Sequence, residues 1–174
     1  GAIAPDFTSK NYKGEDVRFY DLLEDGPAVL VFYRGGWCYY CNLQLREFEK
    51  ERRGFEKYNA KVIALSVDKV EKAAEWVVDK DFTFEVISNT EADILHDYNL
   101  VFQVPEDLAK MYKEKYDIDL EEASGRTDRI IAIPGVVVVD PSKEIIFSYA
   151  NEDYKVRKTP EEILTVLEEW KNAQ

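Results

Sequence analysis

The sequence predicts an α/β protein whose central mixed β-sheet combines parallel strands with one antiparallel hairpin and carries helices on both faces. Apolar runs rich in β-branched and aromatic residues alternate with segments of helical periodicity, the order typical of βαβ units. A chain of 174 residues that is 45% hydrophobic is large enough to bury a core of its own. No repeat, low-complexity tract or linker interrupts it, so we expect a single domain over residues 1–174.

The first βαβ unit lies between residues 28 and 67. The runs AVLVFY (28–33) and KVIALSV (61–67) are almost continuously apolar, which is typical of strands buried on both faces and paired in parallel. Between them we expect a helix from about Cys38 to Tyr58, because one face repeats at helical spacing. That face consists of Cys41, Leu45, Phe48, Arg52 and Phe55.

A second unit extends the sheet by another crossover. A helical face formed by Val70, Ala73, Ala74 and Val77 is followed by FTFEVIS (82–88), which reads as the next strand. The chain then becomes polar and mixed over residues 89–129, with short helices expected at about 91–98 and 105–116. We interpret this segment as a helical insertion within the domain.

The last elements are a hairpin and a helix. GVVVVD (135–140) and EIIFSY (144–149) flank a turn and predict two antiparallel strands. Thr159, Pro160 and Glu162 then stand as N-cap, first helical residue and capping-box acid, which predicts the start of a helix. Its buried stripe consists of Ile163, Leu164, Leu167 and Trp170.

Charge and hydropathy exclude several classes of partner. The net charge is −12 and no block of lysine or arginine occurs, which argues against binding to nucleic acid or to an anionic membrane surface. The longest apolar runs are strand-sized and far below the roughly 20 residues of a membrane span. We expect a cytoplasmic location, although a start at Gly1 without methionine also fits a removed leader or tag.

The only two cysteines lie in WCYYC, where the first buried strand meets the helix. Free N–H groups and the helix dipole lower the pKa of a thiol at a helix N-terminus, and Arg34 can add to this effect on Cys38. Cys41 follows one helical turn later, within reach of a disulfide. A Cys-x-x-Cys beside a βαβ pattern therefore predicts a redox-active dithiol.

Two other interpretations of the cysteines remain open. The pair could be half of a zinc site, but His96 is the only histidine, so four ligands would require a second subunit or carboxylates. Two inert thiols could also pack in a core, since free cysteine behaves as a small hydrophobe. Asp68, at the end of a predicted strand, is most simply a cap of the following helix.

WCYYC after a buried strand resembles the Trp-Cys-x-x-Cys motif of thioredoxin-fold oxidoreductases. The whole chain is similar to the peroxiredoxin-like branch of the alkyl hydroperoxide reductase/thiol-specific antioxidant family. This resemblance is carried by APDFTSKNYKGEDVRFYDLL, FYRGGWCYYCNLQLRE, ALSVD and IPGVVVVD. It implies a thioredoxin-like fold with a peroxiredoxin-like N-terminal extension, and antioxidant or redox activity.

The chain departs from peroxiredoxins at the active helix. Their Pro-x-x-x-Thr-x-x-Cys pattern falls on Arg34, Cys38 and Cys41, so the resemblance implies that Cys41 is the peroxidatic position. Cys38 replaces the threonine that helps to bind peroxide, and Arg34 replaces the proline that shields the site.

A second departure lies before the late strand. Pro134 stands where peroxiredoxins keep an arginine and where thioredoxins have a cis-proline. The resemblance therefore implies a cis Ile133–Pro134 bond that presents the backbone of Ile133 to a bound substrate strand. The missing positive charge could come from Arg34, Arg126 or Arg129.

The leading functional hypothesis is a thiol–disulfide oxidoreductase in which Cys38 attacks and Cys41 resolves, without cofactor or metal. Its partners would be a protein or small-molecule disulfide, or a hydroperoxide, and an external thiol reductant. Trp37, Tyr39 and Tyr40 would line the site. The alternatives are a peroxidase that oxidises Cys41 to a sulfenic acid and resolves it with Cys38, and a non-catalytic redox sensor or binding module.

Overall fold

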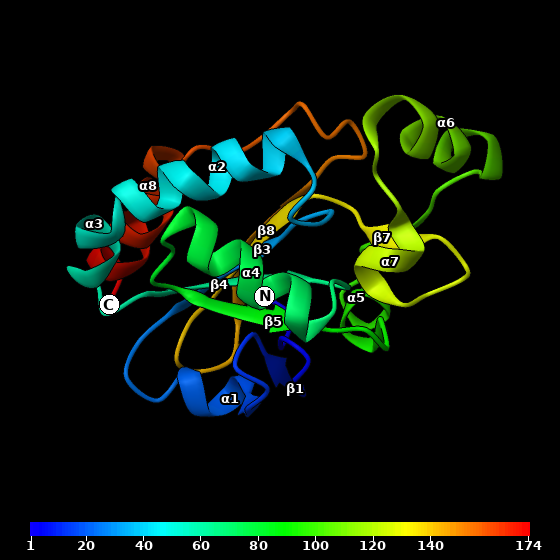
Figure 1. Cartoon of the computed structure of the whole chain (residues 1–174). Coiled ribbons are helices and arrows are strands. Elements are labelled where there is room, and N and C mark those ends of the chain that lie inside the picture. Colours follow the sequence, from blue (N-terminus) through cyan, green and yellow to red (C-terminus); the bar gives the residue numbers. More distant parts are fainter.

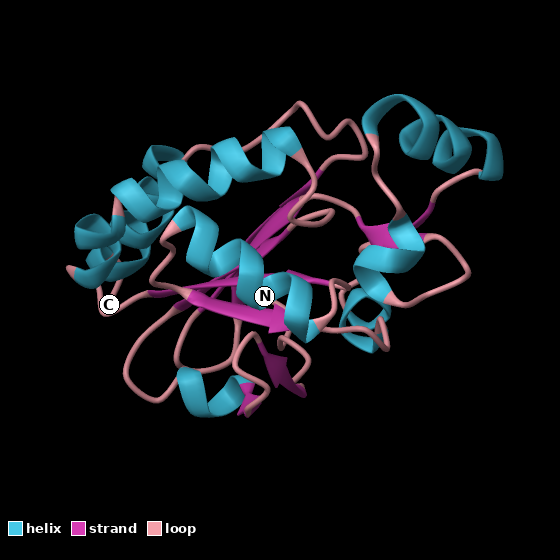
Figure 2. Ribbon diagram, viewed as in Figure 1, coloured by secondary structure: helices cyan, strands magenta, loops and turns pink.

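A computed structural model describes all residues from Gly1 to Gln174. A seven-stranded sheet in the order β2-β1-β5-β4-β3-β8-β9 forms the centre, and β6 and β7 form a separate two-stranded sheet (Figures 1 and 2). The strands are β1 Thr8–Asn11, β2 Asp16–Arg18, β3 Ala28–Phe32, β4 Lys61–Ser66, β5 Glu85–Ser88, β6 Val101–Gln103, β7 Ile130–Ala132, β8 Gly135–Val139 and β9 Ile145–Ala150. The helices are α1 Phe19–Leu22, α2 Tyr39–Lys50, α3 Arg52–Glu56, α4 Val70–Lys80, α5 Asp93–Asp97, α6 Glu106–Tyr116, α7 Leu120–Ser124 and α8 Pro160–Asn172.

The predicted mixed sheet is confirmed. β3 pairs in parallel with β4, and β4 pairs in parallel with β5, as the two βαβ units require. On the other side, β3 pairs antiparallel with β8, which forms the predicted hairpin with β9. The central strand β3 is buried at every position, so its apolar run reflects burial on both faces.

The two faces of the sheet carry two separate hydrophobic clusters. Because side chains alternate along a strand, Val29 and Val31 of β3 point to one face, and Leu30 and Phe32 point to the other. Helices α2, α3, α4 and α8 contribute buried residues to the first face, whereas α1, α5 and α7 contribute to the second. The expectation of helices on both faces is therefore confirmed.

The single helix expected from Cys38 to Tyr58 is two helices. α2 and α3 are separated at Glu51, whose backbone angles of φ −93° and ψ 13° leave the α-helical region. The break changes the direction of the face, so Arg52 is exposed while Phe55 is buried against Phe48. The prediction that Arg52 belongs to the buried stripe is wrong for this reason.

Residues 89–129 contain more structure than the two helices expected there. α5 and α6 are present, but β6 and the short helix α7 were not predicted, and neither was β7, which follows this segment directly. Strands of three residues are too short to display an alternating pattern, and the same explanation applies to part of the β1–β2 hairpin. Val104 and Leu120 of this segment are buried with the second hydrophobic cluster, which ties it to the sheet.

The start of the closing helix is as predicted. Thr159 is the N-cap of α8, and its Oγ1 accepts a hydrogen bond of 3.2 Å from the Glu162 N–H. Ile163 and Leu167 are buried, while Leu164 and Trp170 are half-buried at the edge of the same face. None of the helices combines the length and the apolarity needed to span a membrane.

Candidate active site

The two cysteines lie at the point where β3 gives way to α2. Cys38 is the N-cap of α2, in extended conformation, and its Sγ accepts the Cys41 backbone N–H at 3.3 Å. Both are free thiols, and both are buried, with Cys38 3% exposed and Cys41 fully enclosed. The strand-to-helix placement is as predicted, and both sulfur atoms lie below the surface of the protein.

Two guanidinium groups approach the sulfur atoms. Arg34 Nη1 lies 4.0 Å from Cys38 Sγ, and the Arg34 backbone N–H donates to Cys41 Sγ at 3.4 Å. Arg157 Nη2 lies 3.8 Å from Cys38 Sγ and 3.2 Å from Cys41 Sγ. Arg157 follows Cys41 by 116 residues and was not predicted, because only the fold brings the segment before α8 to this helix.

The positive charge is not supplied by the two other arginines considered from the sequence. Arg126 pairs with Asp128 at 2.6 Å, and Arg129 donates to the Val104 carbonyl at 2.8 Å. Both arginines are engaged within the insertion. Arg34 lies beside the thiols as expected, and Arg157 is the second arginine that carries positive charge there.

The surroundings of the two thiols shift their pKa values in opposite directions. A hydrogen bond from the Cys41 thiol, together with the helix N–H and the charges of Arg34 and Arg157, lowers the pKa of Cys38 to about 6. Burial raises the pKa of Cys41 well above its usual value, and the neighbouring Cys38 raises it further. Although Arg157 lies closer to Cys41, complete burial outweighs that contact, so we assign the negative charge to Cys38.

Aromatic side chains from three segments enclose the guanidinium group of Arg34. The ring of Trp37 lies 5.0 Å from it and that of Tyr154 lies 4.2 Å from it. Tyr112 of α6 has its ring at 5.7 Å and accepts a hydrogen bond of 2.6 Å from Arg34 Nη2 at its hydroxyl oxygen. Tyr112 and Tyr154 were not predicted, and both come from segments remote in sequence from the cysteines.

Of the two tyrosines between the cysteines, only one joins this aromatic group. Tyr40 packs against Tyr154 with ring centres 5.7 Å apart. Tyr39 is 68% exposed and contacts Tyr40 edge-on. Trp37 packs against Tyr112 at 6.1 Å, so it lies over Arg34 as part of the cover of the site.

Asn42, which was not predicted as a site residue, holds the turn before α2 in place. The Asn42 amide donates to the carbonyls of Gly36 and Cys38, each at 2.8 Å. Its oxygen accepts from the Trp76 indole N–H at 2.6 Å. Asn42 thus ties the cysteine turn to α4.

The expected cis bond at Pro134 is wrong. No peptide bond in the chain is cis, so the Ile133–Pro134 bond is trans. The Ile133 N–H donates to the Leu100 carbonyl at 2.8 Å, and the Pro134 carbonyl accepts from the Asn151 N–H at 3.2 Å. Because these backbone groups bond within the fold, Ile133 does not present a free edge to a substrate strand.

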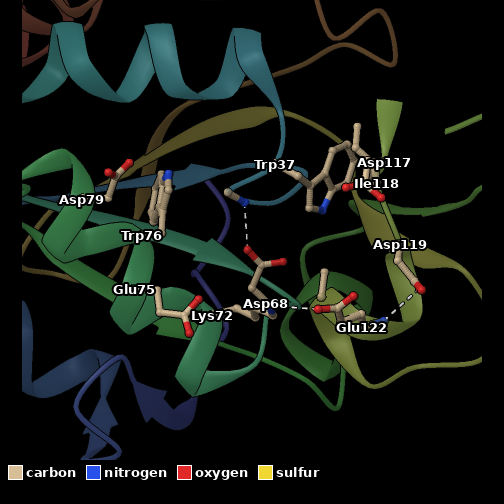
Figure 3. A pocket seen from close by; sticks show the side chains of 12 residues that line it. Trp37, Asp68, Lys72, Glu75, Trp76, Asp79, Asp117, Ile118, Asp119 and Glu122 are labelled. Carbon is tan, nitrogen blue, oxygen red and sulfur yellow. Dashed lines mark hydrogen bonds and ion pairs between the residues drawn. The ribbon is translucent and has the colours of Figure 1, made fainter. Parts of the chain in front are cut away.

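Asp68 does not cap α4. The N-cap of that helix is Lys69, which makes no side-chain cap, and Asp68 is turned inward with only 3% exposure. Its Oδ2 accepts the Gly36 N–H at 2.8 Å, the dashed line at the centre of Figure 3. Burial raises the pKa of Asp68 to about 7. Asp68 therefore supports the loop that leads into the cysteines.

A zinc site would require further His, Cys, Asp or Glu side chains close to the two thiols. No group of three or more His, Cys, Asp or Glu side chains lies close enough together to hold a metal ion. The neighbours of the two sulfur atoms are the guanidinium groups of Arg34 and Arg157 and the backbone N–H groups of Arg34 and Cys41. Positive groups of this kind stabilise a thiolate by charge.

A mixed sheet flanked by helices, with a polarised dithiol at the N-terminus of the helix after its central strand, defines a thioredoxin-like redox protein. The model of the AhpC/TSA family matches residues 1–148. The chain belongs to this family, as the resemblance in its sequence implies.

Known relatives of the chain are peroxiredoxins. It is 29% identical over 174 residues to the mitochondrial peroxiredoxin PRX1 of Saccharomyces cerevisiae, covering 95% of this chain and 59% of the relative. Over 89 residues it is 33% identical to a 1-Cys peroxiredoxin of Dictyostelium discoideum, covering 51% of this chain and 36% of the relative. The chain thus spans about 59% and 36% of the lengths of these two relatives.

Solved peroxiredoxin structures share the fold. Peroxiredoxin 6 of Arenicola marina superposes with a TM-score of 0.81 at 19% identity, covering 100% of this chain and 74% of that one. A yeast mitochondrial 1-Cys peroxiredoxin superposes with a TM-score of 0.76 at 25% identity, covering 99% of this chain and 76% of that one. The fold class expected from the sequence is confirmed.

Proposed function

We propose that the protein is a dithiol-dependent oxidoreductase in which the Cys38 thiolate attacks the substrate and Cys41 resolves the product. The observation that carries this proposal is the polarised pair itself. Cys38 has its pKa lowered to about 6, and Cys41 keeps its proton under conditions where Cys38 is ionised. A thiolate beside a protonated thiol is equipped for two successive sulfur reactions.

The oxidant that this site suits best is a hydroperoxide. The Cys38 thiolate attacks the outer oxygen of ROOH and the O–O bond breaks, so that Cys38 becomes a sulfenic acid. The leaving alkoxide RO⁻ takes a proton from water and departs as ROH. Cys41 then attacks Cys38 Sγ, forming the Cys38–Cys41 disulfide and releasing water. The substrate gains two electrons, and the pair of thiols loses two.

Burial supports a small oxidant. Cys38 is 3% exposed and lies next to an arginine covered by Trp37, Tyr112 and Tyr154. A hydroperoxide can reach a sulfur atom at the bottom of such a site, whereas a protein disulfide would have to displace the aromatic cover. Arg34 and Arg157 are placed to stabilise the negative charge on the leaving oxygen.

Recovery of the dithiol requires an external thiol. We propose a reductant of the glutathione or thioredoxin type, which would reduce the Cys38–Cys41 disulfide by thiol–disulfide exchange. The yeast structure was solved to describe thiol resolution through glutathione and thioredoxin systems. Here the resolving thiol lies in the same helix as the attacking one, so the proposed intermediate is an intramolecular disulfide.

Reduction of a disulfide substrate is the second candidate function. It is favoured by the position of the charged sulfur, because Cys38 is the N-terminal thiol of the pair. It is also favoured by Arg34 and Pro134, which replace the proline and the arginine of the peroxiredoxin pattern. In this reaction Cys38 forms a mixed disulfide with the substrate, which Cys41 then releases.

Single cysteine variants test the order of attack. After one equivalent of hydrogen peroxide, Cys41→Ser should accumulate a sulfenic acid on Cys38 that reacts with dimedone, because the resolving thiol is missing. Cys38→Ser should lose rapid peroxide consumption. If Cys38→Ser instead consumes peroxide at the wild-type rate and carries the label on Cys41, the peroxidatic position of the family governs and our assignment is wrong.

Measuring peroxide consumption and insulin reduction side by side on the wild-type protein separates the two substrates. We expect peroxide to be consumed faster than insulin disulfides are reduced. Rapid insulin reduction without peroxide consumption would favour the second candidate. Loss of neither activity in Cys38→Ser would contradict both.

A further inference from the structure

A cavity of about 380 Å³ opens between α4 and the α6–α7 connection, next to Trp37 (Figure 3). Asp68 lies at its centre, Trp76 borders it from α4, and Trp37 borders it from the cysteine loop. Among the residues that line this cavity, the reaction proposed above involves only Trp37, which also covers Arg34. Its composition therefore calls for a separate explanation.

The lining of the cavity is strongly acidic. It contains six carboxylic acids and a single lysine: Asp68, Glu75, Asp79, Asp117, Asp119, Glu122 and Lys72. The lysine is already paired, with Lys72 Nζ 3.2 Å from Glu122 Oε1. Lys113 Nζ lies 3.7 Å from Asp119, and Lys80 Nζ lies 3.2 Å from Asp79. The lining acids left without a basic partner are therefore Asp68, Glu75 and Asp117, which repel one another across the cavity.

A buried oxygen atom marks where a ligand would be held. Asp68 is 3% exposed, and while its Oδ2 accepts the Gly36 N–H, its Oδ1 has no hydrogen-bond partner in the protein. Leaving a buried carboxylate oxygen unpaired is unfavourable. A donor within the cavity would satisfy this atom, and a positively charged donor would also offset the charge.

The arrangement suits an organic cation better than a compact metal ion. A metal ion collects ligands at one point, yet no three acids of the chain converge in that way. The acids are spread along the two sides of the cavity, and the indoles of Trp37 and Trp76 supply aromatic surface between them. Ammonium groups spaced along an aliphatic chain match separate carboxylates and pack well on indole rings.

We propose that this cavity binds a small aliphatic diamine or polyamine, with one ammonium group donating to Asp68 Oδ1 and another reaching the acids of the rim. Binding would join α4 to the insertion. It would also fix the loop through Gly36, which holds Asp68 Oδ2 and stands two residues before Cys38. The site is independent of the substrate proposed for the thiols.

Calorimetry on the reduced full-length chain tests this proposal, at about pH 8, where the Asp68 carboxyl is ionised. The probes are spermidine and 1,5-diaminopentane, with 1,5-pentanediol as the uncharged analogue and magnesium chloride as a compact cation. We expect one site for each amine. We expect no binding of the diol, and magnesium should bind at least about tenfold more weakly than spermidine.

Three variants locate the site. Asp68→Asn keeps an oxygen for the Gly36 N–H but removes the charge, and should weaken amine binding by about tenfold or more. Glu75→Gln, at an exposed rim position, should weaken it by a few fold. Glu168→Gln changes an exposed acid of α8 outside the cavity and should leave binding unchanged.

Specific results would overturn the proposal. Equal weakening by Glu75→Gln and Glu168→Gln, or equal affinity for magnesium and spermidine, would show binding to diffuse negative charge. Unchanged affinity in a folded Asp68→Asn would do so as well, and if that variant fails to fold, the comparison of Glu75→Gln with Glu168→Gln decides. Tighter binding of a lysine-containing peptide than of spermidine would assign the cavity to a protein partner instead.

Discussion

At the scale of single residues, the chemistry of the site depends on two thiols that differ in pKa. Two thiols of the same kind, one helical turn apart, receive opposite shifts of pKa. Cys38 receives hydrogen bonds from the Cys41 thiol and the helix N–H, whereas Cys41 is completely enclosed. Position at the helix start and depth of burial together decide which sulfur carries the charge.

The first prediction concerns the titration of Cys38. The rate of alkylation of the reduced protein by iodoacetamide should rise through about pH 6 and level off by about pH 8, because the thiolate is then fully formed. Peptide mapping should place the first label on Cys38. A rate that continues to rise beyond pH 9, as for an ordinary thiol, would contradict the assignment.

The second prediction concerns Arg157. Removing its charge in Arg157→Gln should raise the pKa of Cys38, since the guanidinium lies 3.8 Å from the sulfur. Alkylation at about pH 6 should slow by about fivefold, with little change at about pH 8. Arg53→Gln, an exposed arginine of α3, is the matched control and should show the wild-type profile. An equal loss at both pH values would indicate a structural effect instead.

At the scale of secondary-structure elements, α6 contributes to the site although it lies in a segment that the sequence presents as a polar insertion. It has no fully buried residue, yet Tyr112 reaches Arg34 and Trp37. One polar contact and one aromatic contact therefore connect this helix to the cysteine loop. Loss of either should loosen the cover of the site without unfolding the sheet.

The third prediction tests this connection. Tyr112→Phe removes the hydroxyl that Arg34 bonds at 2.6 Å but keeps the aromatic ring. We expect the peroxide reaction of Cys38 to change by about two- to tenfold, because a hydrogen bond to a charged group is lost and Arg34 gains freedom. The free energy of unfolding should fall by no more than about 2 kcal/mol. Tyr116→Phe, on the same helix and 62% exposed, should leave both quantities unchanged.

At the scale of the whole molecule, two buried groups make stability depend on pH in opposite directions. The folded state raises the pKa of Asp68 from 3.8 to about 7, so folding holds a proton that the unfolded chain releases. The contribution of Asp68 to the free energy of unfolding is fully present below pH 3.8 and is lost as the pH rises to about 7. Cys38 acts the other way: its contribution is full above pH 9.0 and is lost as the pH falls through about 6.

The fourth prediction isolates the effect of Asp68. Asp68→Asn cannot ionise, so its stability relative to wild type should increase by about 3 kcal/mol between about pH 5 and pH 8. Urea unfolding of both reduced proteins at several pH values measures the difference. Glu168→Gln should differ from wild type by a constant amount. A difference that does not vary with pH for Asp68→Asn would show that Asp68 is already ionised near its ordinary pKa.

A helix or strand could be predicted from the sequence where residues close to it in the chain determine it. The parallel strands β3 and β4 follow from continuous apolar runs, and α8 follows from the capping pattern at Thr159. The break at Glu51 and the three-residue strands β6 and β7 were missed, because neither changes hydrophobic periodicity over enough residues to be seen.

By itself, the sequence determined the apolar strands, the position of Cys38 and Cys41 at a helix start, and the charge of Arg34 beside them, because all of these depend on neighbours within a few residues. Tertiary structure alone decided the rest. Arg157 and Tyr112 reach the site from remote segments, backbone groups beside the trans Ile133–Pro134 bond are paired within the fold, and Asp68 turns inward to hold Gly36. Burial raises the pKa of Cys41, and Arg157 adds to the local groups that lower the pKa of Cys38; neither burial nor this remote arginine is encoded in local spacing.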